Sequence, residues 1–273
     1  MSEGACERGA AFTALVLAGQ RGGEDPLARR CGVAYKCLAP AGGVPMVARV
    51  LDALAVVPSV DRIFVVLEDP AVLDPLPSFR RWRSEQRCAA LAGAATPSLS
   101  VRKALDEIPA SLPMLVTTAD HALLTPEIVA TFWAAARATG ADVVAGVTTA
   151  EVIRRAYPQT QRTYLRFRDG ACSGANLFAL LTPAARRAVD FWREVERDRK
   201  RPWRMIRAFG LGPLLAYLLG RLTLDAAMAR ASGVIGAQVA AVRLPFADAA
   251  IDVDKPADLV LVDAILGRRA TTG

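Results

Sequence analysis

A glycine-rich segment near the start of the chain, residues 18–23 (AGQRGG), directly follows the apolar run TALVL. Glycines let backbone N–H groups approach anionic oxygens that a side chain would otherwise keep at a distance. Arg21 adds paired guanidinium donors for phosphate, and Lys36 adds a mobile positive charge a little further on. The spacing is neither the Walker pattern nor G-x-G-x-x-G, so on its own it indicates only a turn suited to phosphate.

Acidic residues stand at the ends of two other apolar runs. Asp120 ends the run PMLVTTAD, and Asp252 lies in the segment AIDVDKP with Asp254 two residues after it. Mg²⁺ prefers a small number of carboxylates together with substrate phosphates, so we expect Asp120 and Asp252 to bind Mg²⁺. Asp254 stands at the start of a predicted helix, where we expect it to act as the cap, and it is the reserve metal ligand.

Other chemistries find little support in the composition. His121 is the only histidine, which excludes a multi-histidine metal site and disfavours a Ser-His-Asp hydrolase. We expect His121 to be structural. The five cysteines are scattered and form no C-x-x-C pair, so they indicate neither a zinc site nor a disulfide framework.

Alternating strands and helices must position these residues. The alternation predicts one α/β domain over residues 1–273, with a mostly parallel central sheet covered by helices on both faces. Ligands of such sheets bind beyond the carboxyl ends of the strands, which places the loops 18–36, 117–125 and 248–255 on one rim. The predicted strands are 13–19, 62–68, 113–120, 141–148 and 239–244, and the predicted helices are 45–57, 126–140 and the segment from 256 onward.

The region after residue 160 departs from this regular alternation. Residues 162–181 predict two strands joined around a glycine-rich turn. A basic and then apolar insertion follows at about 186–235, and its 212–231 portion is helical by composition. No linker or low-complexity stretch divides the chain, which favours a single domain.

The net charge of +7 is concentrated in residues 186–207, which hold nine Arg or Lys against four Asp or Glu. Such a segment is either a solvated helix face or a contact with an anionic surface. No recognition motif accompanies it, so we expect no nucleic-acid partner. Peripheral membrane contact through 186–222 and a homodimer both stay open. The polar N-terminus and the absence of a long apolar span favour a cytoplasmic protein.

Four motifs, in order along almost the whole chain, together resemble the MobA-like nucleotidyltransferases. The segment LVLAGQRG is similar to the family's first strand and L-A-G-G-x-G loop, and YKCLAPAGGVPMVARVLDAL to its P-K-x-L segment. The segment LVTTADHALLTPEIV is similar to its strand and D-x-P loop, and DVDKPADL to its closing D-x-D-T-P-x-D-L. Each motif is weak alone, and the set is specific at superfamily level.

The resemblance implies a Rossmann-like domain of the nucleotide-diphospho-sugar transferase type, built in three layers. It implies Mg²⁺-dependent transfer of NMP from an NTP, with CTP or GTP favoured, to a phosphorylated small-molecule acceptor with release of pyrophosphate. The residues it implies are Arg21, Lys36 and Asp120 for catalysis; Leu17, Ala18, Gly19, Gln20, Arg21, Gly22, Lys36, Ser98 and Ser100 for the nucleotide; Gly174 and Asn176, in a predicted SGAN turn, for the acceptor; and Asp120 and Asp252 for the metal.

The sequence also departs from the family pattern. Gln20 stands where the family has Gly, Tyr35 replaces the usual Pro, and no Pro follows His121. Two other functions stay open for these reasons. One is a nucleotide-sugar-dependent glycosyltransferase, which is disfavoured because no second carboxylate completes a D-x-D after Asp120. The other is a non-catalytic nucleotide-binding or membrane-docking module of the same fold.

Overall fold

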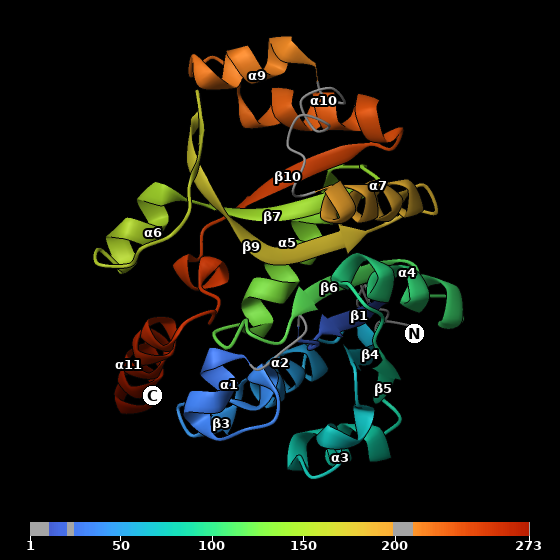
Figure 1. Ribbon diagram of the computed structural model, residues 1–273, viewed down its shortest axis with the longest axis vertical. Helices are drawn as coiled ribbons and strands as arrows, with labels where there is room; N and C mark the ends of the chain where they lie inside the picture. Colours follow the sequence, from blue (N-terminus) through green and yellow to red (C-terminus); the bar gives the residue numbers. More distant parts are fainter. Residues whose placement is uncertain (1–10, 21–24, 199–209, 273) are drawn as a thin grey trace, which may run out of the picture.

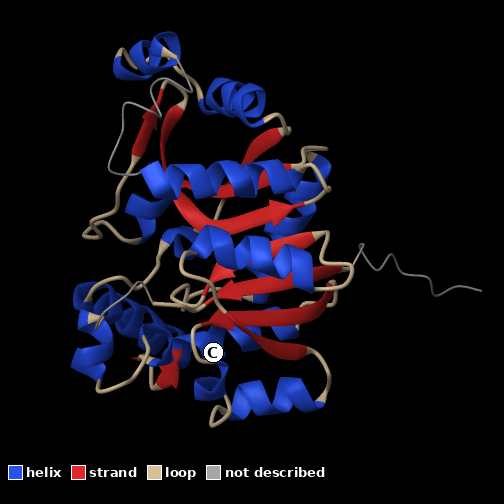
Figure 2. Ribbon diagram, turned by 45° about the vertical axis from the view of Figure 1, so that its right-hand side comes forward, coloured by secondary structure: helices blue, strands red, loops and turns tan. Residues whose placement is uncertain are grey.

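The computed structural model describes residues 11–20, 25–198 and 210–272. An eight-stranded sheet runs through these residues in the order β10-β7-β9-β6-β1-β4-β5, with β8 paired to β9 (Figures 1 and 2). Its strands are β1 Phe12–Leu17, β4 Val60–Leu67, β5 Cys88–Ala92, β6 Met114–Thr118, β7 Val143–Thr149, β8 Leu165–Phe167, β9 Gly170–Leu180 and β10 Val239–Leu244. The short pair β2 Pro40–Ala41 and β3 Val44–Pro45 forms a separate ribbon.

The sheet consists of two parallel blocks joined by one reversed strand. β1 pairs in parallel with β4 and β6, β4 with β5, and β10 with β7. β9 lies between the blocks and is antiparallel to both β6 and β7. The predicted mostly parallel sheet is confirmed, and the five predicted strands correspond to β1, β4, β6, β7 and β10.

Helices cover both faces of the sheet because alternate strand residues point to opposite sides. Ala14 and Val16 of β1 pack in the core beneath α2 (Met46–Ala55) and α5 (Pro126–Ala138). Leu15 packs in the second core beneath α4 (Pro97–Glu107) and α7 (Ala185–Asp198). The helices are α1 Pro26–Cys31, α2 Met46–Ala55, α3 Pro77–Ser84, α4 Pro97–Glu107, α5 Pro126–Ala138, α6 Ala150–Ala156, α7 Ala185–Asp198, α9 Leu211–Leu218, α10 Leu224–Ile235 and α11 Pro256–Thr272, with the 3-10 turns η1 Lys36–Leu38, η2 Pro70–Leu73 and η3 Ala247–Ala250.

Local signals in the sequence explain where the helices begin. Thr125 caps α5, since its hydroxyl accepts a hydrogen bond from the Ile128 N–H at 3.3 Å and Pro126 occupies the first turn. Asp25 caps α1 in the same way, accepting from the Leu27 and Ala28 N–H groups at 2.8 and 3.1 Å. The predicted helices 45–57 and 126–140 are thereby confirmed as α2 and α5.

The helical insertion contains more than one helix. α9 ends near Gly220, whose φ of 64° lies in the left-handed region that favours glycine, and α10 begins after Thr223. The continuous helical portion predicted over 212–231 is therefore interrupted. Part of the predicted basic segment, residues 199–209, lies outside the described residues. Within the described ranges every helix is too short or too polar to span a bilayer.

The predicted SGAN turn is wrong. Residues 173–176 lie within β9, and the chain turns earlier, between β8 and β9 at Arg168 and Asp169. What the sequence pattern shows as a turn is an irregularity in the strand. The β7–β9 register shifts between Ala145 and Val147, and Asn176 takes a φ of 48° there. Asparagine tolerates that backbone conformation better than most residues, so a bulge forms without a glycine at that position.

Candidate active site

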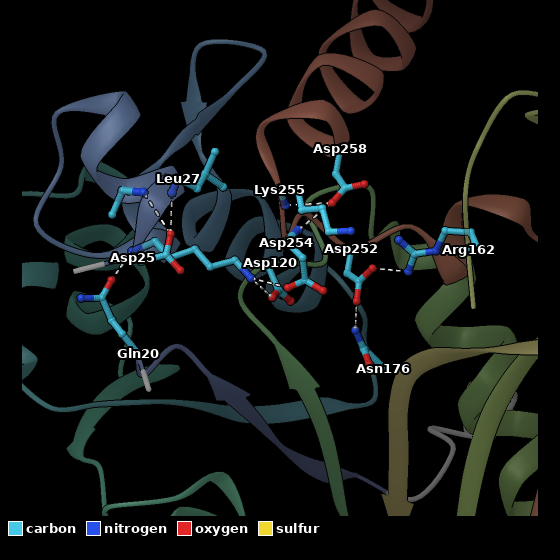
Figure 3. A network of polar contacts seen from close by, with 12 residues as sticks. Gln20, Asp25, Leu27, Asp120, Arg162, Asn176, Asp252, Asp254, Lys255 and Asp258 are labelled. Atoms are coloured by element: carbon cyan, nitrogen blue, oxygen red, sulfur yellow. Dashed lines mark hydrogen bonds and ion pairs between the residues drawn. The ribbon is translucent and has the colours of Figure 1, made fainter. Parts of the chain in front are cut away.

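A cavity of about 680 Å³ opens at the carboxyl ends of β1 and β6, where the sequence places the functional rim. Its polar wall brings together residues that are far apart in the chain and come from four loops and from β9 (Figure 3). The polar and glycine residues in the cavity wall are Gly19, Gln20, Asp25, Lys36, Thr117, Thr118, Asp120, Asn176, Asp252 and Asp254.

Lys36 links two of the carboxylates. Its ammonium group donates to Asp120 Oδ2 at 2.7 Å and to Asp254 Oδ1 at 2.6 Å. Burial alone would lower the pKa of Lys36, but the adjacent charges and hydrogen bonds of Asp120 and then Asp254 raise it above its ordinary value. Lys36 is therefore a fixed positive charge at neutral pH.

Asp254 does not have the capping role that the sequence predicts. Its carboxylate accepts from Lys36, and Asp258 Oδ2 instead accepts from the Asp254 and Lys255 N–H groups at 3.1 and 2.8 Å. An acidic residue in the first turn satisfies these N–H groups, as the second half of a capping box does. The Asp254 side chain therefore does not cap α11, and it lines the polar end of the cavity.

Asp120 has one oxygen without a partner. Its Oδ1 is buried and has no hydrogen-bond partner among the described residues, although Oδ2 accepts from Lys36. Buried polar atoms are nearly always hydrogen-bonded, so an unpaired carboxylate oxygen at a cavity wall indicates a place for a cation or a ligand donor. The neighbouring His121 is fully buried, and burial lowers its pKa, which keeps the imidazole neutral at pH 7.

Gly19 allows a close approach at the end of β1. A Cβ at this position would lie 3.0 Å from Glu68 Oε1, and the Glu68 carboxylate accepts from the Gln20 N–H at 3.0 and 3.2 Å. The Gln20 side chain turns toward the Lys36 segment, accepting from the Lys36 N–H at 2.9 Å and donating to the Ala34 carbonyl at 3.3 Å. The residue that departs from the family pattern therefore holds the Lys36 loop in place.

Asp252 is paired with side chains from two other parts of the chain. Its Oδ2 accepts from Asn176 Nδ2 at 3.0 Å, and its Oδ1 forms an ion pair with Arg162 (Figure 3). Burial would raise the pKa of Asp252, but Arg162 and the hydrogen bond from Asn176 outweigh it and lower that pKa. Asp252 is therefore ionised at neutral pH, and the Asn176 bulge in β9 brings an amide donor to it.

The second half of the cavity is apolar. It runs along the sheet face that α4 and α7 cover, and the Phe178 side chain in its wall is 41% exposed. The apolar wall consists of Leu17, Pro97, Val101, Val116, Val143, Phe178, Leu180, Ala188, Val189 and Trp192. The cavity thus joins a charged end, at the rim of the sheet, to an apolar interior, as ligand sites commonly do.

Several predicted site residues lie away from the cavity wall. Ser98 is fully buried and donates to Glu196 on α7, and the Ser100 hydroxyl accepts from the Ala94 N–H at 2.9 Å. Gly174 is exposed and is not part of the wall. Arg21 and Gly22 lie outside the described residues. Leu17, Gly19, Gln20, Lys36, Asp120, Asn176 and Asp252 all line the cavity, and Ala18 is buried between two of them.

Sequence reasoning missed Arg162, Asp25 and Glu68. The Asp-Pro pair at 25–26 is a helix-start signal that a search of the first loop could have found. Glu68 directly follows an apolar strand, as Asp120 nearly does, so the strand-end rule that found Asp120 applies to it as well. Arg162 lies in an irregular segment between α6 and β8, and no local pattern predicts its pairing with a residue 90 positions away.

The donor set fits Mg²⁺. The described residues contain no cluster of three or more His, Cys, Asp or Glu side chains arranged as a metal cage. Mg²⁺ does not require one, because it is usually held by one or two carboxylates together with substrate phosphates and water. Asp120 and Asp252 provide such carboxylates at the cavity wall, and the unpaired Asp120 Oδ1 is a suitable oxygen donor.

The sequence matches the family model of the MobA-like NTP transferase domain over residues 14–230. No curated protein shows a significant match. Among solved structures, a hypothetical transferase from Thermus thermophilus is 33% identical, with a TM-score of 0.76, and the alignment covers 91% of this chain and 99% of that chain.

More distant structures share the fold. A 4-diphosphocytidyl-2C-methyl-D-erythritol synthase from Anaerococcus prevotii is 14% identical, with a TM-score of 0.61 and coverage of 97% of this chain and 100% of its own. A CMP:2-keto-3-deoxy-manno-octonic acid synthetase, solved as a complex with CTP, is also 14% identical, with a TM-score of 0.58 and coverage of 95% and 99%. The Rossmann-like fold expected from the sequence is confirmed.

Proposed function

This chain belongs to the family of MobA-like NTP transferase domains, and from that membership we propose that it is an Mg²⁺-dependent nucleotidyltransferase. It moves the NMP group of an NTP, with CTP or GTP as the favoured donor, to a phosphorylated small molecule. An oxygen of the acceptor phosphate forms a bond to the α-phosphorus, the bond from that phosphorus to the β-phosphate oxygen breaks, and pyrophosphate leaves. The CTP complex of the structurally similar synthetase supports a cytidine nucleotide as the first donor to try.

The observation that carries the proposal is the position of Lys36 between Asp120 and Asp254, in a cavity wall that Gly19 also lines. Transfer brings together two polyanions, so the main requirement is fixed positive charge and backbone donors rather than a nucleophilic side chain. Lys36 is held protonated, and Gly19 leaves the backbone accessible. In the proposed complex Lys36 exchanges carboxylate oxygens for oxygens of the α-phosphate.

The reaction needs no general base from the chain. A phosphate monoester has a second pKa of about 6, so the acceptor is largely a dianion near neutral pH and attacks without losing a proton to the enzyme. The side chains nearest to Lys36 and Asp120 agree with this requirement. His121 and Cys37 are both buried and neither lines the cavity, and burial raises the pKa of the Cys37 thiol to about 12, so neither is placed to take a proton from a ligand there.

Asp120 and Asp252 are the proposed metal ligands, with Asp254 in reserve. When bound, Mg²⁺ supplies positive charge to the phosphate oxygens that gain charge during transfer. Asn176 holds Asp252 in position through its amide, and Gln20 holds the Lys36 loop. These two contacts orient Asp252 and Lys36, and neither Asn176 nor Gln20 takes part in making or breaking a bond.

The test is pyrophosphate release with Mg²⁺ and each of CTP, GTP, UTP and ATP, against a panel of phosphorylated alcohols, cyclitols and sugars. We expect release with one donor and one acceptor class, and a loss of at least 100-fold in kcat for Asp120→Asn. Asp61→Asn is the matched control, since Asp61 is an exposed carboxylate on β4 away from the cavity. Release of free NDP from a nucleotide sugar, with no pyrophosphate from any NTP, would replace this proposal by the glycosyltransferase.

A further inference from the structure

Both proposed metal ligands are already paired with cations of the chain. Lys36 neutralises Asp120, and Arg162 neutralises Asp252. The two pairs differ in how they are held. The Lys36 backbone N–H donates a hydrogen bond to the Gln20 side chain, whereas Arg162 lies in an irregular segment between α6 and β8.

The Arg162–Asp252 pair is largely enclosed. The Arg162 side chain is 13% exposed and the Asp252 side chain 17% exposed. Asp252 lines the cavity, whereas Arg162 pairs with Asp252 Oδ1 and is not part of the wall, so its guanidinium group can meet a ligand in the cavity only after it leaves Asp252. A metal ion that binds Asp252 from the cavity therefore meets a carboxylate that already has a positive neighbour.

A metal on Asp252 and the Arg162 guanidinium group repel each other at such short range, so metal binding weakens the attraction between Asp252 and Arg162. When a metal neutralises Asp252, Arg162 becomes a charge in an enclosed place without its anion, which is costly unless another anion arrives. In the proposed reaction the acceptor brings a phosphate monoester to the cavity, and Asn176, which the resemblance assigns to the acceptor, is hydrogen-bonded to Asp252. A guanidinium group also presents paired donors that match phosphate oxygens.

We propose that Arg162 and the metal compete for Asp252, and that metal binding transfers Arg162 from Asp252 to the phosphate of the acceptor. Arg162 is then a specificity-determining residue for a phosphate monoester acceptor, and the acceptor phosphate binds better after the metal than before it. This inference rests on the proposed function, because it takes Asp252 as a metal ligand and a phosphorylated acceptor as the second substrate.

The first test measures metal binding directly, using Mn²⁺ as a paramagnetic substitute for Mg²⁺ in EPR titrations of the full chain. Arg162→Met removes the competing cation, and we expect it to lower the Kd for Mn²⁺ about tenfold. Arg162→Lys keeps a charge but loses the paired donors, and we expect an intermediate Kd. Arg166→Met is the matched control, because Arg166 lies four residues away on β8 with an exposed side chain, and it should leave the Kd unchanged.

Asp252→Asn tests whether the effect of Arg162 on Mn²⁺ affinity acts through Asp252. It should weaken Mn²⁺ binding by at least tenfold, and in that background Arg162→Met should have no further effect. The proposal would be overturned if Arg162→Met bound Mn²⁺ no more tightly than the wild-type chain and Arg162→Lys showed no gain either. Arg162 would then have only a structural role, as the ion-pair partner of Asp252. Binding of Mn²⁺ that Asp252→Asn does not alter would overturn the proposal as well.

The second test uses inorganic phosphate as the probe for the acceptor. We expect saturating Mn²⁺ to lower the Kd for phosphate about tenfold in the wild-type chain, and to have no effect in Arg162→Met. A metal effect that persists in Arg162→Met would mean that phosphate binds the metal itself, which contradicts the transfer of Arg162.

Neither test depends on turnover. A chain that shows both effects but releases no pyrophosphate with any substrate pair would refute the proposed function while the competition for Asp252 stands. A chain that turns over with an unchanged Mn²⁺ affinity in Arg162→Met would refute only the competition.

Discussion

Lys36→Met removes the positive charge that joins Asp120 to Asp254 and keeps an unbranched side chain. Lys36 and Asp120 are each 19% exposed in their pair, and breaking a largely buried ion pair costs about 3–5 kcal/mol because the remaining charge loses its partner. Since a fifth of each side chain still contacts water, we expect the low end, about 3 kcal/mol. The second pair adds little, on the order of 0–1 kcal/mol, because Asp254 is 59% exposed.

A loss of about 3 kcal/mol should lower the Tm by roughly 6–12 °C in a chain of this size. Thermal unfolding followed by circular dichroism measures that change. Pyrophosphate release below the transition measures the loss of transition-state stabilisation, and we expect kcat to fall about 10²–10³-fold, as it does when one preorganised donor is removed. Lys255→Met is the matched control, since Lys255 is exposed at the start of α11, and it should shift stability by no more than about 0.5 kcal/mol.

The pH dependence of the Lys36 effect has a definite sign. The pKa of Lys36 is raised in the folded chain, so its contribution to stability is complete below the unfolded value of about 10.4 and is lost only as the pH rises through the folded value. The difference in unfolding free energy between wild type and Lys36→Met should therefore be the same at pH 7 and pH 9. A Tm equal to that of Lys255→Met, or a difference that disappears by pH 9, would refute the ion-pair reasoning.

Substitutions at two positions and one labelling experiment test separate parts of the structure. Gly19→Ala should weaken NTP binding about 10-fold, because the added Cβ keeps the nucleotide away from the backbone. It should cost no more than about 1 kcal/mol of stability, since that Cβ meets the movable end of Glu68 at 3.0 Å. Equal NTP affinity in isothermal titration would argue against close backbone approach. Asn176→Ala should lower stability by about 1–2 kcal/mol in urea unfolding, because alanine is strained at a φ of 48°, and Asn176→Gly should restore most of it. Because burial raises the pKa of Cys37 to about 12 and Cys31 is half-buried, iodoacetamide at pH 8 should label Cys31 well before Cys37; mass spectrometry showing the reverse order would contradict the burial of Cys37.

The general plan of the site follows from short-range patterns in the chain. Apolar runs ending in Gly19 and Asp120 predict neighbouring strands, and the rule for the carboxyl ends of parallel strands then brings both residues to one cavity. The same rule places Asp252, which lies in the predicted rim loop 248–255. Periodicity alone was enough for this part because each of these residues sits where a regular element ends.

The rest depends on contacts that no local pattern contains. Whether Asp254 caps α11 or pairs with Lys36 is decided by Asp258, which satisfies the helix N–H groups, and by a lysine more than 200 residues away. Ser98 has the residue type of a nucleobase ligand, yet its hydroxyl is taken by Glu196 of a helix that packs on α4. Gly174 and Asn176 look like part of a turn in the sequence although they lie within β9, because sequence composition does not distinguish a bulge from a turn.

The reversed direction of β9 has a consequence for how this domain can diversify. β1 and β6 bring Gly19 and Asp120 to the site just beyond their carboxyl ends, in loops that insertions and deletions can reshape. β9 runs the other way along the wall, and its cavity residues Asn176, Phe178 and Leu180 recur at every second position on one face. A change of acceptor then requires single substitutions on an unchanged backbone, while Gly19 and Lys36, on other elements, keep the donor the same. Related chains should therefore differ in substrate by the residues of one strand face, with no difference in loop length between them.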